Sequence, residues 1–505
     1  MRRWELTIAL DPSREQPLFL QLAGAIAEDI RRAVLKPGEA LPGSRELAER
    51  LGINRNTVVA SYGELASEGL ISTRIGGGTF VAMSTIDPFA SRKPLIQEPT
   101  YALAPPVYTP SPISVAPPGT LLICNGMPDA RLFPASALAR AFRRAIGQRG
   151  RSMLTYADPS GHPRLRTELA AMLARTRGLP VVPDNLMVTH SIEQGIDLVA
   201  RMLLQPGDVV VVEAFGYPPA WSVLKLAGAR LIPLPLDGDG LDVDALEALL
   251  THQRVRAVFL TPHHQFPTTV VMSPARRTRL AKLALQHGFA IIEDDYDHEF
   301  HYVGKPILPI AAGAGGANVI YVGSLSNLLA PGISTGFVVA PAPVFERLAS
   351  LRAASDARGD VAMECAIAEL FEDGEVLRHM RRMRRIYIAR RDALATSLTR
   401  HLGSAVTFRI PDGGMGLWAQ VDDAIDIAAW SRAGEHEGVQ FFDAGRYEFF
   451  QREQPFMRLG FSYYDEGELD EAVRRMARAL AQLHGRAISS TRDATVRSAQ
   501  TASSG

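Results

Sequence analysis

The first 82 residues show apolar positions at helical spacing, followed by a short alternating stretch. Segment 17–35 has apolar residues three and four positions apart and ends before Pro37-Gly38. Two shorter helices are predicted in GSRELAERLGI and NRNTVVASYGELASEGL, with Ser44 and Asn54 as their N-caps. LISTRIGGGTFVA then alternates around a glycine turn, which predicts a hairpin. Three helices and a hairpin predict a winged helix-turn-helix domain at residues 1–82.

The segment from residue 83 to 119 has a different composition. Nine prolines lie between Met83 and Gly119, with few long periodic patterns. Proline favours extended, semi-rigid chain. We therefore expect a proline-rich linker at 83–119.

From about residue 120 to 485, apolar runs alternate with helix-like segments. The runs include DVVVVE, RAVFLTP, FAIIEDD and NVIYVGS. This alternation predicts an α/β domain, with a mostly parallel sheet covered by helices, over about 120–370. From about 375 a long amphipathic helix precedes a smaller C-terminal α+β portion, which ends near residue 485. The small, polar tail 486–505 is predicted to be disordered.

Composition describes an ordinary globular protein and limits its location. Hydrophobic residues make up 47%, charged residues 21%, and the formal net charge is zero, which gives no hint of a polyanionic partner. Two cysteines far apart, Cys124 and Cys365, fit a reduced compartment without a disulfide framework. MRRWELTIALDP has no long apolar core, and no apolar run is long enough to cross a bilayer. We expect a cytoplasmic protein without a signal peptide.

The N-terminal domain carries candidate DNA contacts. A helix-turn-helix places the start of its second helix near base edges, and Arg55, Asn56 and Thr57 begin that helix here. Arginine can bond guanine bidentately, and asparagine adenine. Candidates for contact with phosphate or the minor groove are Arg45, Arg74, Gly76 and Thr79. The alternative is a packing domain with solvated arginines, because residues 1–82 carry ten Lys+Arg and ten Asp+Glu.

Acidic residues end one of the buried strands of the larger domain. AIIEDDYDHEF places Asp294 and Tyr296 where α/β folds bind ligands. A carboxylate there can hold a protonated pyridine nitrogen, and a tyrosine a phenolic oxygen; the alternative is a structural role as caps or surface residues. A metal interpretation would use the flanking histidines, which are His263, His264, His298 and His301. Because they lack tight ligand spacing, no metal site is predicted.

Two parts of the chain resemble one family. LPGSRELAERLGINRNTVVASYGELASEGLISTRIGGGTFV resembles the GntR-type winged helix along its whole length. Residues from about 120 to 475 resemble the aminotransferase-like domain of the MocR/GabR regulators, which are GntR winged helices fused to a fold-type-I pyridoxal-phosphate domain. The matching stretches are YADPSGHPRLRTELAAML, LLQPGDVVVVE, TPHHQFPTTVVMSPARR, IIEDDYDHEF and RHMRRMRRIYIARRDAL. The resemblance implies a homodimeric transcription regulator that binds a double-stranded DNA operator.

The resemblance also implies a pocket for pyridoxal phosphate. Asp294 would pair with the pyridine nitrogen, Tyr296 with the ring oxygen, and Tyr217 would stack on the ring. Tyr156 would reach the partner subunit's phosphate site. Arg458 would grip the carboxylate of a substrate or effector, although a surface arginine is the alternative. The remaining pocket residues by this resemblance are His190, Ser191, His264, Ser326, Asn327 and Ser334.

This chain departs from the family pattern around the expected cofactor. Asn327, in GSLSN, stands at the position of the Schiff-base lysine, and Ser334 stands where an arginine is expected near the phosphate. The turn that usually has the sequence TSGA is THSI here, at 189–192, and Thr269 stands at a usual glycine. An asparagine amide is not nucleophilic enough to form an imine. We therefore predict no catalytic residue, no covalent pyridoxal phosphate and weakened noncovalent binding.

None of the five lysines is expected to replace the missing amine. Lys225 and Lys282 lie in helix-like sequence, Lys305 in a loop, and two lie outside the domain. The leading hypothesis is a regulator that senses a small-molecule effector through population shift. The alternatives are a pyridoxal-phosphate aminotransferase with an accessory domain, which the missing lysine argues against, and a ligand-free dimerisation scaffold for the DNA-binding heads.

Overall fold

The computed structural model describes ten ranges of the chain, which are 10–14, 16–32, 34–74, 78–82, 117–124, 126–150, 155, 158–313, 316–356 and 359–483. The chain divides into two compact units, Met1–Ala104 and Pro105–Gly505. Residues 83–116 of the predicted linker and the predicted tail 486–505 lie outside the described ranges. Within those ranges no helix combines the length and apolar character needed to span a membrane.

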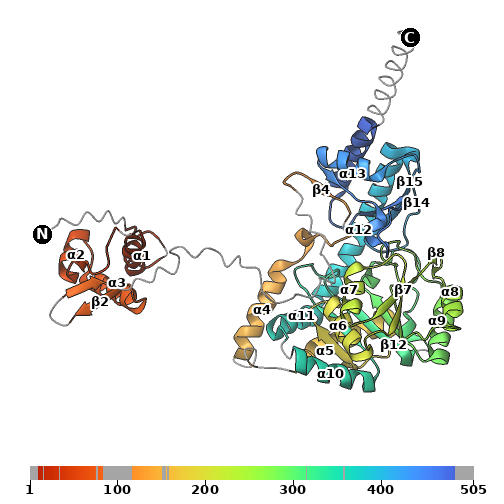
Figure 1. Ribbon diagram of the computed structural model, residues 1–505, viewed down its shortest axis with the longest axis horizontal. Coiled ribbons are helices and arrows are strands. Elements are labelled where there is room, and N and C mark those ends of the chain that lie inside the picture. The colour runs from red at the N-terminus through yellow and green to blue at the C-terminus, as the bar shows by residue number, and fades with distance from the viewer. Residues whose placement is uncertain are drawn as a thin grey trace, which may run out of the picture. The chain divides into compact units, whose positions relative to one another are not determined.

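The first unit is a three-helix domain with a small antiparallel sheet (Figure 1). Its elements are α1 (Leu18–Arg31), β1 (Ala40–Leu41), α2 (Ser44–Leu51), α3 (Arg55–Ser67), β2 (Ile71–Arg74) and β3 (Gly78–Val81). Leu22 and Ile26 of α1 and Val58 and Leu65 of α3 are buried in its core. Gly52 ends α2 at φ +64°, a left-handed conformation that glycine adopts without strain. The winged helix-turn-helix prediction is confirmed.

The two predicted N-caps of this unit have different outcomes. The side chain of Asn54 accepts a hydrogen bond from the backbone N–H of Asn56 at 2.8 Å, which confirms it as the N-cap of α3. The prediction for Ser44 is wrong, because Gly43 takes the N-cap position and Ser44 is already the first helical residue. The Ser44 hydroxyl instead accepts a hydrogen bond from Arg55 Nε at 3.4 Å.

A seven-stranded sheet forms the centre of the second unit. In spatial order its strands are β5 (Leu186–Thr189), β13 (Gly336–Val339), β12 (Val319–Ser324), β11 (Ala290–Asp295), β10 (Ala257–Leu260), β6 (Val209–Glu213) and β7 (Arg230–Leu234). Every adjacent pair is parallel except the two that involve β13. Most strand residues are buried, as expected for a sheet covered on both faces. The predicted mostly parallel sheet is confirmed.

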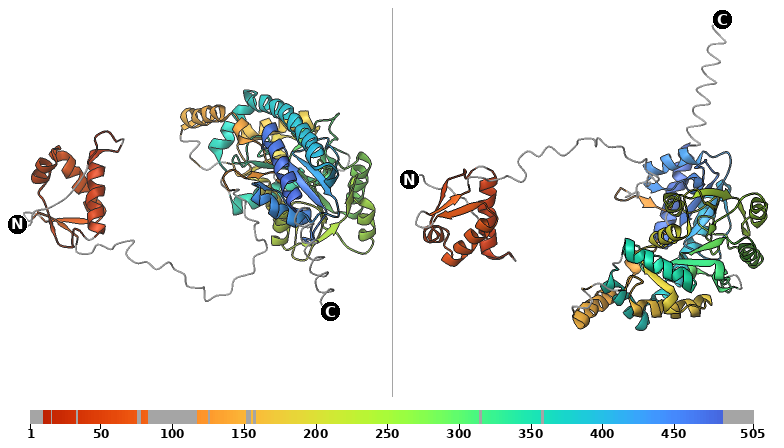
Figure 2. Two further views of the ribbon diagram at one scale, coloured as in Figure 1. Left: turned by 90° about the horizontal axis from the view of Figure 1, so that it is seen from above. Right: turned by 60° about the horizontal axis from the view of Figure 1, so that its bottom comes forward.

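Helices cover both faces of this sheet (Figure 2). The helices are α6 (Ile192–Leu203), α7 (Pro218–Leu226) and α10 (Ala342–Ser355) on one face, and α8 (Val243–Leu250) and α9 (Pro274–His287) on the other. Val210 and Val212 of β6 pack with the first group, whereas Val209 and Val211 pack with the second. This is the alternation of side chains along a strand.

The remaining elements share a third hydrophobic cluster with the smaller C-terminal portion. They are β4 (Leu121–Leu122), α4 (Ala135–Arg149), α5 (Pro163–Arg177), α11 (Val361–Glu372), α12 (Glu375–Leu402), β14 (Val406–Phe408), β15 (Gly416–Val421), α13 (Ile427–His436), β16 (Val439–Gln440) and β17 (Phe456–Gly460). A short hairpin, β8 (Leu236–Asp237) with β9 (Gly240–Leu241), lies before α8. β14, β15 and β17 form an antiparallel sheet, and residues 466–483 are helical. The predicted long helix from about 375 begins at Glu375.

Candidate functional site

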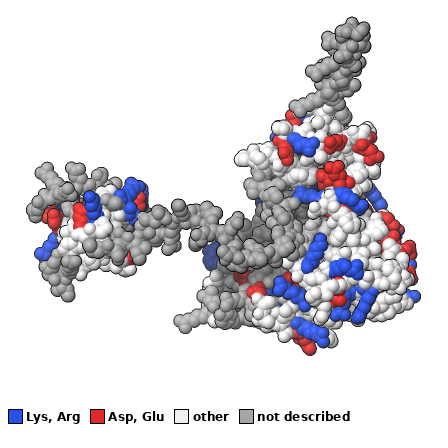
Figure 3. All heavy atoms as spheres, in the orientation of Figure 1, with Lys and Arg blue, Asp and Glu red and all other residues white. Residues whose placement is uncertain are grey.

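The surface of the first unit presents the predicted DNA contacts on α2 and α3. Arg45, Arg55 and Asn56 are exposed, and Thr57 is half-buried behind them in the first turn of α3. Figure 3 shows basic side chains interspersed with acidic ones on the visible face of the chain, in keeping with its zero net charge. Recognition would therefore depend on where these residues lie on the helices and not on a broad basic field.

The wing places Thr79 on β3, paired with Leu41 of β1 and Thr73 of β2. Arg74 ends β2, and its side chain lies outside the described part of the structure. Gly76 also lies outside it, as does Tyr156 of the predicted pocket. These three remain sequence-based expectations.

A cavity of about 1120 Å³ lies in the second unit, beside the carboxyl ends of β10, β11 and β12. These ends are where an α/β sheet binds ligands. Eight of the eleven predicted pocket residues line the cavity; they are Ser191, Tyr217, Asp294, Tyr296, Ser326, Asn327, Ser334 and Arg458. His190 lies outside the lining; its half-exposed ring lies 3.5 Å from Asp356. His264 is completely buried behind Tyr296 and lies outside the lining as well.

Asp294 presents an unsatisfied carboxylate to this cavity. It is 2% exposed, and its Oδ1 has no hydrogen-bond partner among the described residues. Burial, together with the nearby carboxylates Asp295 and Glu193, raises the pKa of Asp294 well above its usual range. Such a group gains most from a ligand that brings a protonated nitrogen, because ion pairing restores the charged form.

Arg458 is a buried cation on the cavity wall. It is 3% exposed, lies 5.0 Å from the ring centroid of Phe266, and forms no ion pair with an acidic residue in the described ranges. A Cβ atom on Gly126 or Gly416 would come within 2.7 Å of its guanidinium, so the two glycines leave room for Arg458 in this position. A buried guanidinium without a carboxylate is matched in charge and geometry to a ligand carboxylate.

Tyr296 connects the cavity to the buried residues behind it. Its hydroxyl donates a hydrogen bond to the backbone carbonyl of His264 at 2.8 Å. Burial and the nearby Asp297 raise the pKa of Tyr296 well above its usual value, although Arg458 opposes this. The phenol therefore stays neutral and acts as a hydrogen-bonding group.

The turn after β12 holds Asn327 in a fixed position. The Asn327 amide donates a hydrogen bond to the backbone carbonyl of Tyr296 at 3.1 Å, and the backbone N–H of Ser326 donates to the hydroxyl of Ser324 at 3.0 Å. Asn327 thus joins the turn to the residues that follow β11. It supplies neutral donors and acceptors and no amine.

The N-terminus of α6 faces the same cavity, and two of the backbone amides around it already have protein partners. The backbone N–H of Gln194 donates to Ser191 Oγ at 3.2 Å, and the N–H of His190 donates to Gln194 Oε1 at 2.8 Å. The carboxylate of Glu193 accepts a hydrogen bond from the Tyr217 hydroxyl at 2.6 Å. A free helix N-terminus favours anions, but an anion here would meet the Glu193 carboxylate, and the amides of His190 and Gln194 are already bonded.

Several lining residues were missed by the sequence analysis. Glu193 and Lys225 line the cavity, as do Cys124 and Arg446 from segments far away in the sequence. Lys225, set aside above as part of a helix, does lie on α7, but its Nζ lies 5.1 Å from the ring centroid of Phe449 at the cavity. Burial raises the pKa of Cys124 to about 11. Glu193 could have been noticed because it directly follows the altered turn.

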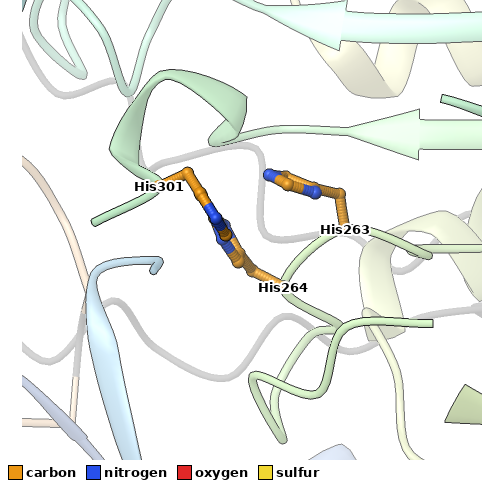
Figure 4. A group of neighbouring side chains, drawn as sticks. All are labelled: His263, His264 and His301. Atoms are coloured by element: carbon orange, nitrogen blue, oxygen red, sulfur yellow. The ribbon is translucent and has the colours of Figure 1, made fainter. Parts of the chain in front are cut away.

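Three histidines gather behind the cavity, outside its lining. His263 and His264 follow β10, and His301 follows the short helix His298–Phe300. One ring nitrogen from each lies within 4.8 Å of the other two, and all three residues are buried (Figure 4). Figure 4 shows the three side chains converging. The sequence analysis predicted no metal site, because the spacing of these histidines along the chain is not that of metal ligands. His263 and His264 follow β10 whereas His301 follows β11, so they come together only in the folded sheet.

The arrangement defines a winged-helix head joined in one chain to an aminotransferase-like domain with an internal cavity. Comparison with known families agrees with both halves. "Bacterial regulatory proteins, gntR family" matches residues 18–81, and "Aminotransferase class I and II" matches residues 121–476.

Relatives match over most of the chain. The probable rhizopine catabolism regulatory protein MocR of Rhizobium meliloti is 30% identical over 94% of this chain and 96% of its own. The pyridoxine biosynthesis transcriptional regulator PdxR of Corynebacterium glutamicum is 32% identical over 78% of this chain and 82% of its own. Among solved structures, the α-aminoadipate aminotransferase LysN of Thermus thermophilus has a TM-score of 0.68 at 28% identity, over 73% of this chain and 94% of its own.

The chain belongs to the family of GntR-type regulators that carry an aminotransferase class I and II domain. It is a transcription regulator in which this second domain is the ligand-sensing part. The domain has the fold of enzymes that associate with pyridoxal phosphate.

Proposed function

We propose that this regulator senses a small zwitterion, with a carboxylate and a protonated nitrogen, in the cavity of its second unit, and that it does so without a covalent pyridoxal-phosphate imine. The hydrogen bond between Tyr217 and Glu193 is the main supporting observation, because it holds a carboxylate in the cavity in the first turn of α6, directly after the turn where the family resemblance expects phosphate binding. Binding of the effector shifts the population of conformations in which the head engages DNA.

The part of the cavity lined by Asp294, Tyr217 and Tyr296, where the resemblance places the pyridoxal ring, suits a nitrogen-containing ligand. Asp294, with its unpaired Oδ1, is positioned to accept a protonated nitrogen. Tyr217 and Tyr296 also line the cavity and could contact a flat or apolar ligand group. Arg458 supplies the complementary site for the carboxylate. The two charges of a zwitterion would each meet an oppositely charged buried group.

The part of the cavity lined by Ser191, Glu193 and Ser334, where the resemblance expects the cofactor's phosphate, does not suit a phosphate group. A phosphate carries up to two negative charges and is usually bound by arginine, lysine and free backbone amides. The cavity instead offers Glu193, Ser191 and Ser334 there, with two amides of the turn already bonded. These residues favour the loss of pyridoxal phosphate as a resident cofactor.

The residues also argue against the aminotransferase alternative. Asn327 has no nucleophilic amine, so the covalent step that transamination requires cannot start from it. Lys225 does reach the cavity wall, where its ammonium lies over Phe449. The experiment must therefore exclude an imine between Lys225 and pyridoxal phosphate.

Spectroscopy tests the absence of an imine. The purified protein is mixed with pyridoxal phosphate and its visible absorption is recorded before and after borohydride. We expect no reducible imine band, and no cofactor mass attached to the chain. A strong reducible band that disappears in Lys225→Met would overturn the proposal.

We further infer that the protein acts on DNA as a homodimer, with a head on each half-site. Arg45, Arg55, Asn56 and Thr57 lie on the elements that a helix-turn-helix presents to the groove. Gel-shift experiments with DNA upstream of its own coding region, together with sedimentation analysis, test this. Absence of a specific complex at modest salt would count against the DNA-contact assignment.

Thermal shifts distinguish the sensor from a ligand-free scaffold. Amino acids and other zwitterions should raise the melting temperature, because a ligand that binds only the folded state stabilises it. Inorganic phosphate should not. A protein that responds to none of the zwitterions would be a scaffold.

A further inference from the structure

Four buried histidines lie together behind the cavity, and two of them, His263 and His298, have ring nitrogens without a hydrogen-bond partner among the described residues. His263 is 2% exposed, and neither of its ring nitrogens has a hydrogen-bond partner among the described residues. A buried polar group without a partner normally destabilises a protein, so its retention needs a reason. Its ring packs against those of His264, His298 and His301, at centroid distances of 4.0, 4.5 and 5.5 Å.

The neighbouring pair already has the geometry of two ligands of one ion. His264 Nε2 and His301 Nδ1 lie 3.2 Å apart. Two ligands of a tetrahedral zinc ion, each at 2.0–2.1 Å, are about 3.3–3.4 Å apart. A hydrogen bond between the two rings would account for this distance as well, but it would leave both nitrogens of His263 unsatisfied.

A carboxylate fixes the orientation of the central ring. His264 Nδ1 lies 2.9 Å from Asp297 Oδ1, and both side chains are completely buried. With Nδ1–H donating to Asp297, the lone pair of His264 Nε2 faces His301. This is the carboxylate–histidine pairing that orients metal-binding imidazoles and makes them more basic.

The surrounding charges can balance a divalent cation. Asp297 Oδ2 has no hydrogen-bond partner in the described structure, and the ring of His298, the neighbour of Asp295, stacks on that of His263 at a centroid distance of 4.5 Å. His298 lies 2.9 Å from Asp295, on the other side of the cluster. Two buried arginines lie near these acids: Arg177, whose Nη1 lies 3.9 Å from Asp295, and Arg277, which donates its hydrogen bonds to three backbone carbonyls and lies 3.8 Å from Glu293.

We propose that His263, His264 and His301 bind one divalent transition-metal ion of the zinc class. Three neutral imidazoles with a carboxylate behind them suit zinc, and also cobalt, nickel and copper, better than the oxygen-preferring magnesium and calcium. The ion would give His263 its missing partner. It would also fix His264, whose backbone carbonyl accepts the hydrogen bond of Tyr296 at the cavity wall.

Metal binding to the full-length, untagged protein tests the proposal. The protein is treated with a chelator, dialysed, and titrated with Zn²⁺, and its metal content is measured after gel filtration. We expect one ion per chain. Substitution by Co²⁺ should give the intense visible bands of tetrahedral coordination, a readout on the wild-type protein that requires no variant to fold.

Variants assign the ligands. The double variant His263→Asn/His301→Asn should lose the stoichiometric ion, and Asp297→Asn should bind it about 10–100-fold more weakly. His287→Asn, which removes an exposed histidine at the end of α9, is the matched control and should retain it. Circular dichroism and gel filtration check that the variants fold.

Two results would overturn the proposal. One is a wild-type protein that takes up no Zn²⁺ beyond the level of the double variant, which would leave the rings as a hydrogen-bonded and stacked cluster. The other is a stoichiometric ion that the double variant His263→Asn/His301→Asn retains in full, which would place the ion on other ligands. These outcomes are independent of the zwitterion proposal, because they involve neither an effector nor DNA.

Discussion

The side-chain amide of Asn327 donates a hydrogen bond to the backbone carbonyl of Tyr296 at 3.1 Å. The bond joins the turn after β12 to the segment that follows β11, on the wall of the cavity. A lysine at this position would project an ammonium group instead of a short neutral amide. The bond therefore connects Asn327 to Tyr296, which also contacts Arg458 and His264.

Restoring the amine alone should not restore tight cofactor binding. We expect the single variant Asn327→Lys to bind pyridoxal phosphate at least tenfold more weakly than the triple variant Glu193→Gln/Asn327→Lys/Ser334→Arg. A tenfold difference in affinity corresponds to about 1.4 kcal/mol, roughly the contribution of one ionic contact to the phosphate. Fluorescence titration and borohydride-reducible absorbance measure the difference. Equal affinity of the two variants would show that the part of the cavity where the resemblance expects the phosphate is not the obstacle.

Arg458 should determine the affinity for the effector's carboxylate. Hydrogen bonds to charged groups contribute about 1.5–3 kcal/mol. Arg458→Gln should therefore lower the affinity for the zwitterion that raises the melting temperature most by about 10–150-fold. Arg458→Lys should recover little, because lysine cannot form the bidentate fork. Calorimetry measures this. Arg201→Gln, which removes an exposed arginine of α6 paired with Asp197, is the control and should leave affinity unchanged.

The start of α3 should carry sequence specificity. Loss of a base contact costs about 1–3 kcal/mol, so Arg55→Ala or Asn56→Ala should weaken operator binding by about 5–150-fold with less effect on nonspecific DNA. Arg45→Ala should weaken binding to all sequences alike and reduce the slope of log affinity against log salt concentration by about one. Fluorescence anisotropy at several salt concentrations separates these effects. Arg32→Ala, at the end of α1, removes the same charge away from the predicted groove-facing helix; an equal loss there would contradict the assignment.

Glu213 should make stability depend on pH. It is buried beside Thr261 and Gln265, and burial raises its pKa to about 7 from 4.5. The folded state therefore binds a proton that the unfolded state releases, so this contribution to stability is full below about pH 4.5 and is lost as pH rises to about 7. The loss is on the order of 3 kcal/mol.

Glu213→Gln should remove that dependence. Urea unfolding at pH 5, 6 and 7 should show wild-type stability falling relative to the variant across this range. Glu247→Gln, which changes an exposed side chain on α8, should keep the wild-type slope. Parallel curves for wild type and Glu213→Gln would contradict the prediction.

The head illustrates how much local sequence can predict. Asn54 caps α3, Gly52 ends α2, and the alternating residues after Leu70 form the hairpin, all within short stretches of chain. The one wrong cap, Ser44, concerns a shift of a single residue. In the second unit the apolar runs predicted the strands, because strands buried on both faces must be apolar throughout.

The cavity was predicted only in part. Asp294 and Tyr296 follow a recognisable strand, and the family resemblance added Tyr217 and Arg458. Lys225 was set aside because a helical pattern does not show which way one side chain points relative to a neighbouring element. Cys124 and Arg446 were missed, because they reach the wall from segments more than 300 residues apart.

The sequence by itself determined the two domains, the class of fold and the absence of an amine at residue 327, since each depends on residue type and local periodicity. Only the tertiary structure decided that Glu193 meets Tyr217, that Asp294 Oδ1 has no hydrogen-bond partner in the described ranges, and that His263, His264 and His301 converge. The physical reason is that parallel strands adjacent in the sheet bring together side chains from separate parts of the chain. Burial then removes the water that would otherwise satisfy their polar groups.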